Sequence, residues 1–155
     1  MLIESIITRL ESSSSRTFNI FSKILESVDI NSNDYLTKGT NTLSLIHYPN
    51  TNNQYGISEH TDWGFLTLLS TNEGGLQVKI NNFWVDVPPL DNHFIVNIAD
   101  MLEIISNGQY KSTEHRVIIT EEKHSIVLFF QPDYNFIVKP HINSDIYKPI
   151  KFGDY

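Results

Sequence analysis

The apolar residues of the first thirty positions recur every three to four residues, which is the spacing of one face of an α-helix. One stripe runs over residues 2–10 and a second over residues 18–28, with a run of serines at 12–15 between them. Such stripes are usually packing surfaces that face a core, and a helix that binds a partner is the alternative. The pattern therefore predicts a helical segment over residues 1–40.

From residue 42 onward, the pattern changes to short apolar runs that alternate with polar positions and are divided by turn residues. Such runs are typical of β-strands, and turn signals about every eight to twelve residues favour a double-sheet roll. The predicted strands are residues 43–48, 57–62, 65–70, 76–80, 83–87, 94–98, 114–120, 125–131 and 136–139. We expect a mainly β domain over residues 41–140 and an irregular tail over residues 141–155.

Two shorter patterns add detail to this β domain. The pair Asn81-Asn82 separates two predicted strands and favours a hairpin turn. Residues 100–106 predict a short helix that ends at Asn107-Gly108. Asn97 and Asp100 are interpreted as residues that cap and brace this helix.

Composition limits the class of protein. The 155 residues suffice for one domain with a core, and the apolar fraction of 40% is that of a folded protein. A net charge of −7 argues against a nucleic-acid partner or an anionic membrane, since both require basic patches. The absence of cysteine excludes disulfides, zinc–thiolate sites and thiol nucleophiles. Because no apolar run approaches the length of a membrane span and no signal-peptide pattern is visible, we expect a soluble, cytoplasmic protein.

The first candidate for chemistry is His60-Thr61-Asp62, with a second histidine, His115, far downstream. Side chains two positions apart on an extended strand share one face, so His60 and Asp62 would point the same way. Two imidazoles and one carboxylate on one face of a metal leave three positions open, which is the arrangement of non-haem Fe(II) oxygenases. By itself the pair is a weak signal, because a histidine and an aspartate often flank an ordinary turn.

The surrounding sequence strengthens the metal hypothesis, because several further blocks follow in a fixed order. They are His60–Leu69, Gly74–Val78, Trp84–Pro89, Phe94–Leu102, Asn107-Gly108, Tyr110–Thr113 and His115–Val117. In this order and spacing, the chain resembles the Fe(II)/2-oxoglutarate-dependent dioxygenases, in the branch that includes isopenicillin N synthase. The resemblance covers roughly residues 43–138, the catalytic half of such an enzyme.

This resemblance implies a double-stranded β-helix, or jelly roll, with a metal near one open end. His60, Asp62 and His115 match the positions of the iron ligands in that family. The implied cofactor is Fe(II), with 2-oxoglutarate as co-substrate and O2 as oxidant. The family binds the far carboxylate of 2-oxoglutarate with an Arg-x-Ser pair and a tyrosine from the first strand, and Tyr48 and Ser125 match the tyrosine and the serine.

Lys123 is the main departure from the family pattern, because it stands where the family has arginine. Lysine keeps the positive charge but lacks the planar fork that binds a carboxylate through two hydrogen bonds. Co-substrate affinity could be weaker, or the bound acid could differ. The alternative is that Lys123 is only a solvated residue beside Glu121 and Glu122. The remaining histidines, His47, His93, His124 and His141, are interpreted as structural.

The leading hypothesis is an Fe(II)- and 2-oxoglutarate-dependent oxygenase that oxidises a small organic substrate by hydroxylation, desaturation or ring closure. Two alternatives stay open: an iron oxidase that does not use 2-oxoglutarate, and a catalytically inactive jelly-roll binding module or gene remnant. Relatives in this branch are usually longer, so the chain is expected to be either a minimal version with an open site or a fragment. An open roll exposes apolar surface, so we expect a homodimer or a partner subunit to cover it.

Overall fold

The computed structural model describes residues 39–50 and 54–155, together with residues 19, 22–24 and 26. The chain divides into two compact units, Met1–Thr37 and Lys38–Tyr155. The few described residues of the first unit are helical. Of the helical segment predicted for residues 1–40, residues 39–40 are also described and lie in no helix, and the other positions lie outside the described residues. Within the described part of the chain, no helix has the length and apolar character needed to cross a membrane.

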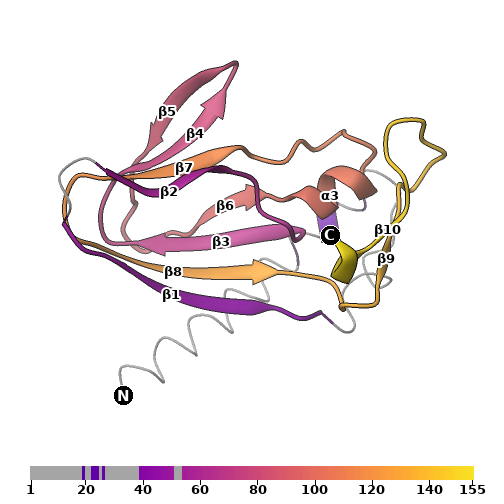
Figure 1. The fold of residues 1–155 in the computed structure, drawn as a ribbon, viewed down its shortest axis with the longest axis horizontal. Coiled ribbons are helices and arrows are strands. Elements are labelled where there is room, and N and C mark those ends of the chain that lie inside the picture. The colour runs from indigo at the N-terminus through magenta and orange to yellow at the C-terminus, as the bar shows by residue number, and fades with distance from the viewer. Residues whose placement is uncertain (1–18, 20–21, 25, 27–38, 51–53) are drawn as a thin grey trace. The chain divides into compact units, whose positions relative to one another are not determined.

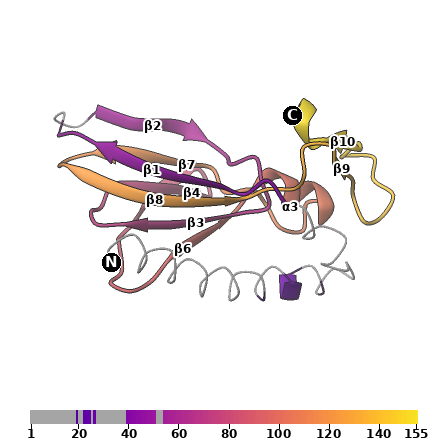
Figure 2. The same ribbon diagram turned by 90° about the horizontal axis from the view of Figure 1, so that it is seen from below.

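Two four-stranded antiparallel sheets face each other in the second unit (Figures 1 and 2). The first sheet has the order β1-β8-β3-β6, with bounds Thr42–Tyr48, Lys123–Phe130, Leu66–Thr71 and Ile95–Ile98. The second has the order β2-β7-β4-β5, with bounds Gln54–His60, His115–Ile119, Leu76–Ile80 and Phe83–Val87. Strands that are neighbours in a sheet are mostly distant in sequence, as a jelly roll requires. The predicted mainly β, double-sheet roll is therefore confirmed.

Alternation along β8 shows how the sequence selects the inner face of the first sheet. Lys123, Ser125 and Val127 are buried, whereas His124 between them is exposed. Successive side chains of a strand point to opposite faces. Every second residue of β8 therefore faces the partner sheet. The core between the sheets includes a cluster of four buried residues: Tyr48, Leu76, Val117 and Ile119.

Two predicted turns form for the expected backbone reasons. Asn81 and Asn82 have φ angles of 49° and 67° and connect β4 to β5. Asparagine tolerates this left-handed region, which a two-residue hairpin of matching twist requires. Asn107 and Gly108 take φ angles of 52° and 79° after helix α3 (Asp100–Ile105), and the Gly108 N–H donates to the Glu103 carbonyl. The predicted hairpin and helix end are thus confirmed.

The start of α3 differs from the prediction. Its N-cap position is Ala99, and no side chain caps the first turn. Instead, the backbone N–H of Asp100 donates to the Asp62 carbonyl, which joins α3 to the segment that follows β2. The prediction that Asn97 and Asp100 cap the helix is therefore wrong. The carbonyl of Asp62, and not a capping side chain, accepts the hydrogen bond from the first N–H of the helix.

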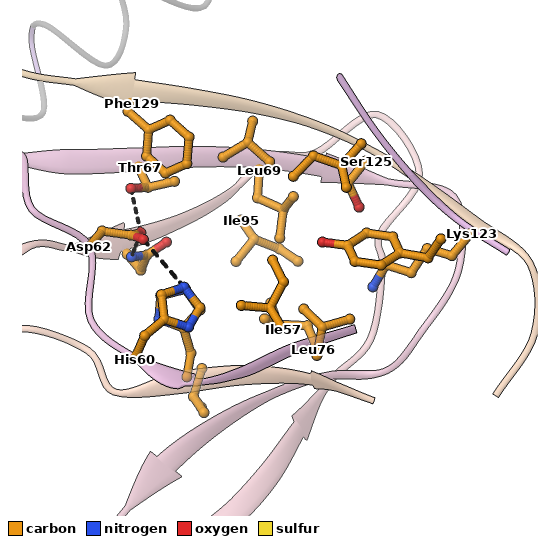
Figure 3. Close-up of a pocket in the computed structure, with 17 residues that line it drawn as sticks. Ile57, His60, Asp62, Thr67, Leu69, Leu76, Ile95, Lys123, Ser125 and Phe129 are labelled. Atoms are coloured by element: carbon orange, nitrogen blue, oxygen red, sulfur yellow. Dashed lines mark hydrogen bonds and ion pairs between the residues drawn. The ribbon is translucent and has the colours of Figure 1, made fainter. Parts of the chain in front are cut away.

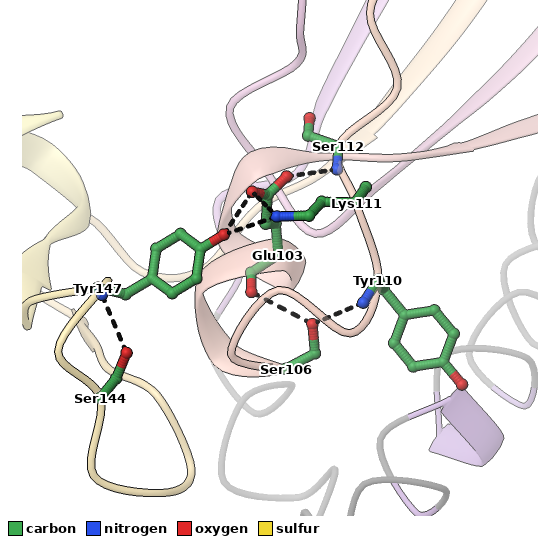
Figure 4. A network of polar contacts seen from close by, with 7 residues as sticks. All are labelled: Glu103, Ser106, Tyr110, Lys111, Ser112, Ser144 and Tyr147. Carbon is green, nitrogen blue, oxygen red and sulfur yellow. Dashed lines mark hydrogen bonds and ion pairs between the residues drawn. The ribbon is translucent and has the colours of Figure 1, made fainter. Parts of the chain in front are cut away.

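The last fifteen residues contain more regular structure than the expected irregular tail. β10 (Ile150–Lys151) pairs with β9 (Ile137–Val138), and a 3₁₀ turn follows over Phe152–Asp154. Figure 4 shows how Tyr147 from this tail reaches α3, where its hydroxyl donates to Oε1 of Glu103 at 2.6 Å. Strands of two residues have no periodicity that a sequence pattern can reveal, which explains the difference.

Candidate metal centre and its pocket

A mostly apolar pocket of about 70 Å³ lies between the two sheets. All six residues that the sequence singled out line it: His60, Asp62, His115, Tyr48, Lys123 and Ser125. Figure 3 shows His60 and Asp62 at one end and Lys123 and Ser125 at the other. Leu69, Leu76, Ile57 and Ile95 lie between these two polar ends (Figure 3).

The end of the pocket at His60 holds a compact set of three polar side chains. His60 ends β2, and its register partner His115 begins β7. Oδ1 of Asp62 lies 3.7 Å from Nε2 of each histidine, and the three donor atoms lie within 4.8 Å of one another. Asp62 follows β2 rather than lying within it, so tertiary folding and not strand alternation alone brings its carboxylate to the histidines.

Backbone carbonyls determine which nitrogen of each imidazole is available. Nδ1 of His60 lies 2.7 Å from the Ser58 oxygen, and Nδ1 of His115 lies 2.8 Å from the Thr113 oxygen. A carbonyl oxygen only accepts, so each neutral ring carries its proton on Nδ1 and keeps the lone pair on Nε2. In both rings, the nitrogen with the free lone pair is therefore Nε2, which faces Asp62. This is the tautomer that a metal ligand needs.

The carboxylate of Asp62 is held on its other side. Asp62 is 6% exposed, and its Oδ2 accepts hydrogen bonds from Oγ1 of Thr67 at 2.6 Å and from Nδ2 of Asn97 at 2.8 Å. These two bonds leave Oδ1 facing the imidazoles. Neither partner was predicted from the sequence, although Asn97 is the one polar residue of β6 and Thr67 lies among the leucines of β3.

This donor set fits a divalent first-row metal. Two imidazole nitrogens with free lone pairs and one carboxylate oxygen converge, which suits Fe(II) and leaves coordination positions for other ligands. A wider hollow of about 410 Å³ adjoins His60 and Asp62, and Thr42, Trp63, Phe129 and Gln131 help to line it. Trp63 is 62% exposed at this hollow, so it remains available to a molecule that enters.

The side chain of Lys123 lies at the opposite end of the pocket. It is only 2% exposed, so the interpretation of Lys123 as a solvated residue is wrong. Burial lowers its pKa, and the negative charge of Glu73 opposes that effect. Nζ donates to the Gly74 carbonyl at 2.8 Å, and no other hydrogen-bond acceptor contacts it among the described residues. An ammonium has three donors, so a second, anionic partner would stabilise the buried charge.

Tyr48 and Ser125 accompany Lys123 in this end of the pocket. Tyr48 is the cross-strand partner of Lys123, whose Nζ lies 5.9 Å from the centre of the tyrosine ring. Burial raises the pKa of Tyr48, so its hydroxyl keeps its proton. Oγ of Ser125 lies 3.2 Å from Oγ1 of Thr71. The sequence-predicted residues are therefore brought together as two polar groups at opposite ends of one cavity.

Comparison with known proteins agrees with this geometry. The profile of the 2OG-Fe(II) oxygenase superfamily matches residues 39–132. Thebaine 6-O-demethylase of Papaver somniferum is 36% identical over 148 residues, which are 89% of this chain and 41% of that enzyme. Lateral branching oxidoreductase 1 of Arabidopsis thaliana is 39% identical over 107 residues, which are 64% of this chain and 29% of that protein. The chain thus spans less than half the length of these relatives.

Solved structures show the same fold. A full-length protein of Neurospora crassa, in complex with alpha-KG and 5-formyluracil, superimposes with a TM-score of 0.84 at 27% identity, and the match covers 99% of this chain and 58% of that one. JOX2, in complex with 2OG, Fe and JA, gives a TM-score of 0.84 at 28% identity over 93% of this chain and 48% of its own. From the matched profile, the fold and the relatives together, we conclude that this chain belongs to the 2OG-Fe(II) oxygenase superfamily.

Proposed function

We propose that this chain is the catalytic part of an Fe(II)- and 2-oxoglutarate-dependent oxygenase that oxidises a small organic substrate with O2. The observation that carries the proposal is one pocket with a two-histidine, one-carboxylate set at one end and the buried ammonium of Lys123 at the other. A dicarboxylic keto acid has the matching chemistry, with chelating atoms at one end and an anionic group at the other. The bound 2OG and Fe of JOX2 support the same assignment.

In this proposal, His60, Asp62 and His115 hold the iron. The hydrogen bonds of each imidazole to a backbone carbonyl fix the ring orientation before the metal arrives. Thr67 and Asn97 do the same for the carboxylate. Bound Fe(II), together with 2-oxoglutarate, supplies the activation of O2 that oxidises a substrate C–H bond, with succinate and CO2 as the other products.

Lys123 binds the far carboxylate of 2-oxoglutarate, and Ser125 and Tyr48 offer hydroxyl groups beside it. Lysine acts as a compact point charge and not as a planar fork, so it attracts the carboxylate without enforcing a bidentate geometry. The apolar side chains between the two ends exclude water from the co-substrate, which strengthens the attraction between opposite charges. The organic substrate enters through the wider hollow beside Trp63.

The experiment that tests this function is an anaerobic titration of the metal-free protein, first with Fe(II) and then with 2-oxoglutarate. We expect the weak visible charge-transfer band of an iron-chelated keto acid. His60→Ala should abolish the band, whereas His93→Ala, at an exposed histidine outside the pocket, should leave it unchanged.

Two other results would contradict the proposal in different ways. Iron binding without the band would favour an iron oxidase that does not use 2-oxoglutarate, and the lysine at position 123 is the feature that favours this alternative. A folded protein that binds no iron would favour an inactive jelly-roll binding module.

We also propose that a second copy of the chain or a partner subunit covers part of the roll. Leu45 on β1 and Phe83 on β5, the edge strands of the two different sheets, are each 74% exposed, which supports apolar contacts at these edges. Light scattering on the purified chain tests self-association, and a monodisperse monomer at high concentration would contradict the homodimer.

A further inference from the structure

A second cluster of metal-ligating side chains lies outside the pocket, where β1 meets β8. His47 and His124 are cross-strand partners, and Glu122 directly precedes β8. All three residues are exposed, in contrast to their neighbours Tyr48 and Lys123, which face inward. The alternation of the two strands therefore puts the cluster on the outer face of the sheet, opposite to the pocket.

The three side chains are already close enough to share one ion. One potential donor atom of each lies within 4.8 Å of the others. Nε2 of His47 lies 3.0 Å from Oε1 of Glu122. The rings of His47 and His124 stack with their centres 4.6 Å apart and their planes 8° apart.

The backbone of His124 is fixed from its other side. Its N–H donates to Oδ1 of Asn72 at 2.7 Å, and its carbonyl accepts from the Asn72 N–H at 3.3 Å. The register of β1 on β8 fixes His47 opposite to it. Because the backbone is already fixed, binding of an ion would restrict only the side-chain rotations of these residues. This lowers the entropic cost of binding.

The chemistry of the cluster selects the class of ligand. Imidazole nitrogen is a good donor for Zn²⁺, Cu²⁺ and Ni²⁺, and one carboxylate offsets part of their charge. The chain as a whole carries a net charge of −7, which favours the approach of a cation. Because the cluster is open to solvent, water can occupy the remaining coordination positions.

We propose that His47, Glu122 and His124 form a second metal site, which binds Zn²⁺ or a similar borderline divalent ion independently of the central iron site. Because the ligands come from both β1 and the start of β8, the bound ion links the edge strand to its neighbour. The same two strands carry Tyr48 and Lys123 on the inner face, so the ion stabilises the register that pairs them.

Calorimetric titration with Zn²⁺ tests the proposal in a His60→Ala/His115→Ala chain, which lacks two ligands of the central site. We expect one bound Zn²⁺ and at least about a tenfold loss of affinity when His124→Gln is added. Glu122→Gln should weaken binding in the same direction. His93→Gln, at an exposed histidine elsewhere, is the matched control and should leave the isotherm unchanged. Equal isotherms for the His124→Gln and His93→Gln chains would overturn the proposal.

The wild-type chain gives an independent test if the double variant does not fold. We expect two bound Zn²⁺ per chain, falling to one in His47→Gln/His124→Gln. Hydrogen exchange of the backbone amides of residues 42–48 should slow on Zn²⁺ addition in the wild type but not in this variant. An unchanged stoichiometry would overturn the proposal, and so would unchanged exchange of β1 amides in zinc-loaded wild-type protein.

Discussion

Asn97 donates a hydrogen bond from Nδ2 to Oδ2 of Asp62 across 2.8 Å, although 35 residues separate the two positions. Together with the hydroxyl of Thr67, this bond occupies Oδ2 and directs Oδ1 towards the two imidazoles. β6 therefore contributes to the proposed metal centre without supplying a ligand. Partners of this kind orient a ligand before the metal binds and raise affinity through that preorganisation.

Asn97→Ala should weaken Fe(II) binding about 10- to 100-fold, because the carboxylate of Asp62 then loses one of its two orienting bonds. Anaerobic competition against a coloured chelator measures the affinity. Asn143→Ala, at an exposed asparagine in the C-terminal tail, is the control and should bind iron as the wild type does. Equal affinities of the Asn97→Ala and wild-type chains would show that Thr67 alone is sufficient to orient Asp62.

Lys123→Met removes the charge but keeps an unbranched side chain that is only one heavy atom shorter. We expect the concentration of 2-oxoglutarate at half-saturation of the charge-transfer band to rise at least about tenfold, because the buried carboxylate loses its charged partner. Lys123→Arg should retain binding within about tenfold of the wild type. Lys139→Met removes an exposed lysine outside the pocket and should have no effect. An unchanged half-saturation in Lys123→Met would mean that another group receives the carboxylate.

The affinity for 2-oxoglutarate should also fall as pH rises through the alkaline range. Burial lowers the pKa of Lys123 below the ordinary value of 10.5, so the ammonium loses its proton earlier than a surface lysine does. Binding therefore weakens with rising pH, beginning below 10.5. In Lys123→Arg the guanidinium stays charged, and this decline should move to higher pH. Identical pH profiles of the two proteins would contradict the role of Lys123.

Glu103 should make the stability of the fold depend on acid pH. Burial by itself raises the pKa of Glu103, but hydrogen bonds from Tyr147, the Ser112 N–H and Lys111 outweigh it and hold the pKa below 4.5 (Figure 4). The charged form is thus favoured by folding, so its contribution is present above pH 4.5 and disappears as pH falls through the lowered pKa.

Glu103→Gln should accordingly cost about 1–2 kcal/mol of unfolding free energy at neutral pH. Urea unfolding at a series of pH values should show that this difference shrinks as pH falls below the ordinary pKa of a glutamate. Glu121→Gln, at an exposed position, should show neither the cost nor the pH dependence. A cost for Glu103→Gln that stays constant with pH would indicate lost packing in place of lost charge.

Metal removal should destabilise the roll, because the proposed ligands join the end of β2 to the start of β7. A ligand at one hundred times its dissociation constant adds about 2.7 kcal/mol to the unfolding free energy. We therefore expect a chelator to lower the thermal midpoint of the iron-loaded protein. His115→Ala should show no response to the chelator at low iron concentration. A response of equal size in both proteins would place the stabilising iron elsewhere.

Local patterns predicted most of the β domain. The alternation in β8, the Asn81-Asn82 turn and the Asn107-Gly108 helix end involve backbone preferences that act over a few residues. The helix start at Ala99 and the pairing of β9 with β10 were not predictable in this way, since partners distant in sequence decide them.

Motif and spacing predicted His60, Asp62 and His115 as metal ligands, and the resemblance to the family showed that Lys123 stands in the place of an arginine. The orientation of the Asp62 carboxylate and the burial of Lys123 depend instead on strands that meet across the roll. Each imidazole is oriented locally, by a backbone carbonyl two residues earlier in the chain. Contacts between strands bond Asp62 to Thr67 and Asn97 and bury Lys123. Hydrogen bonds and desolvation act through space, so a linear pattern does not specify them.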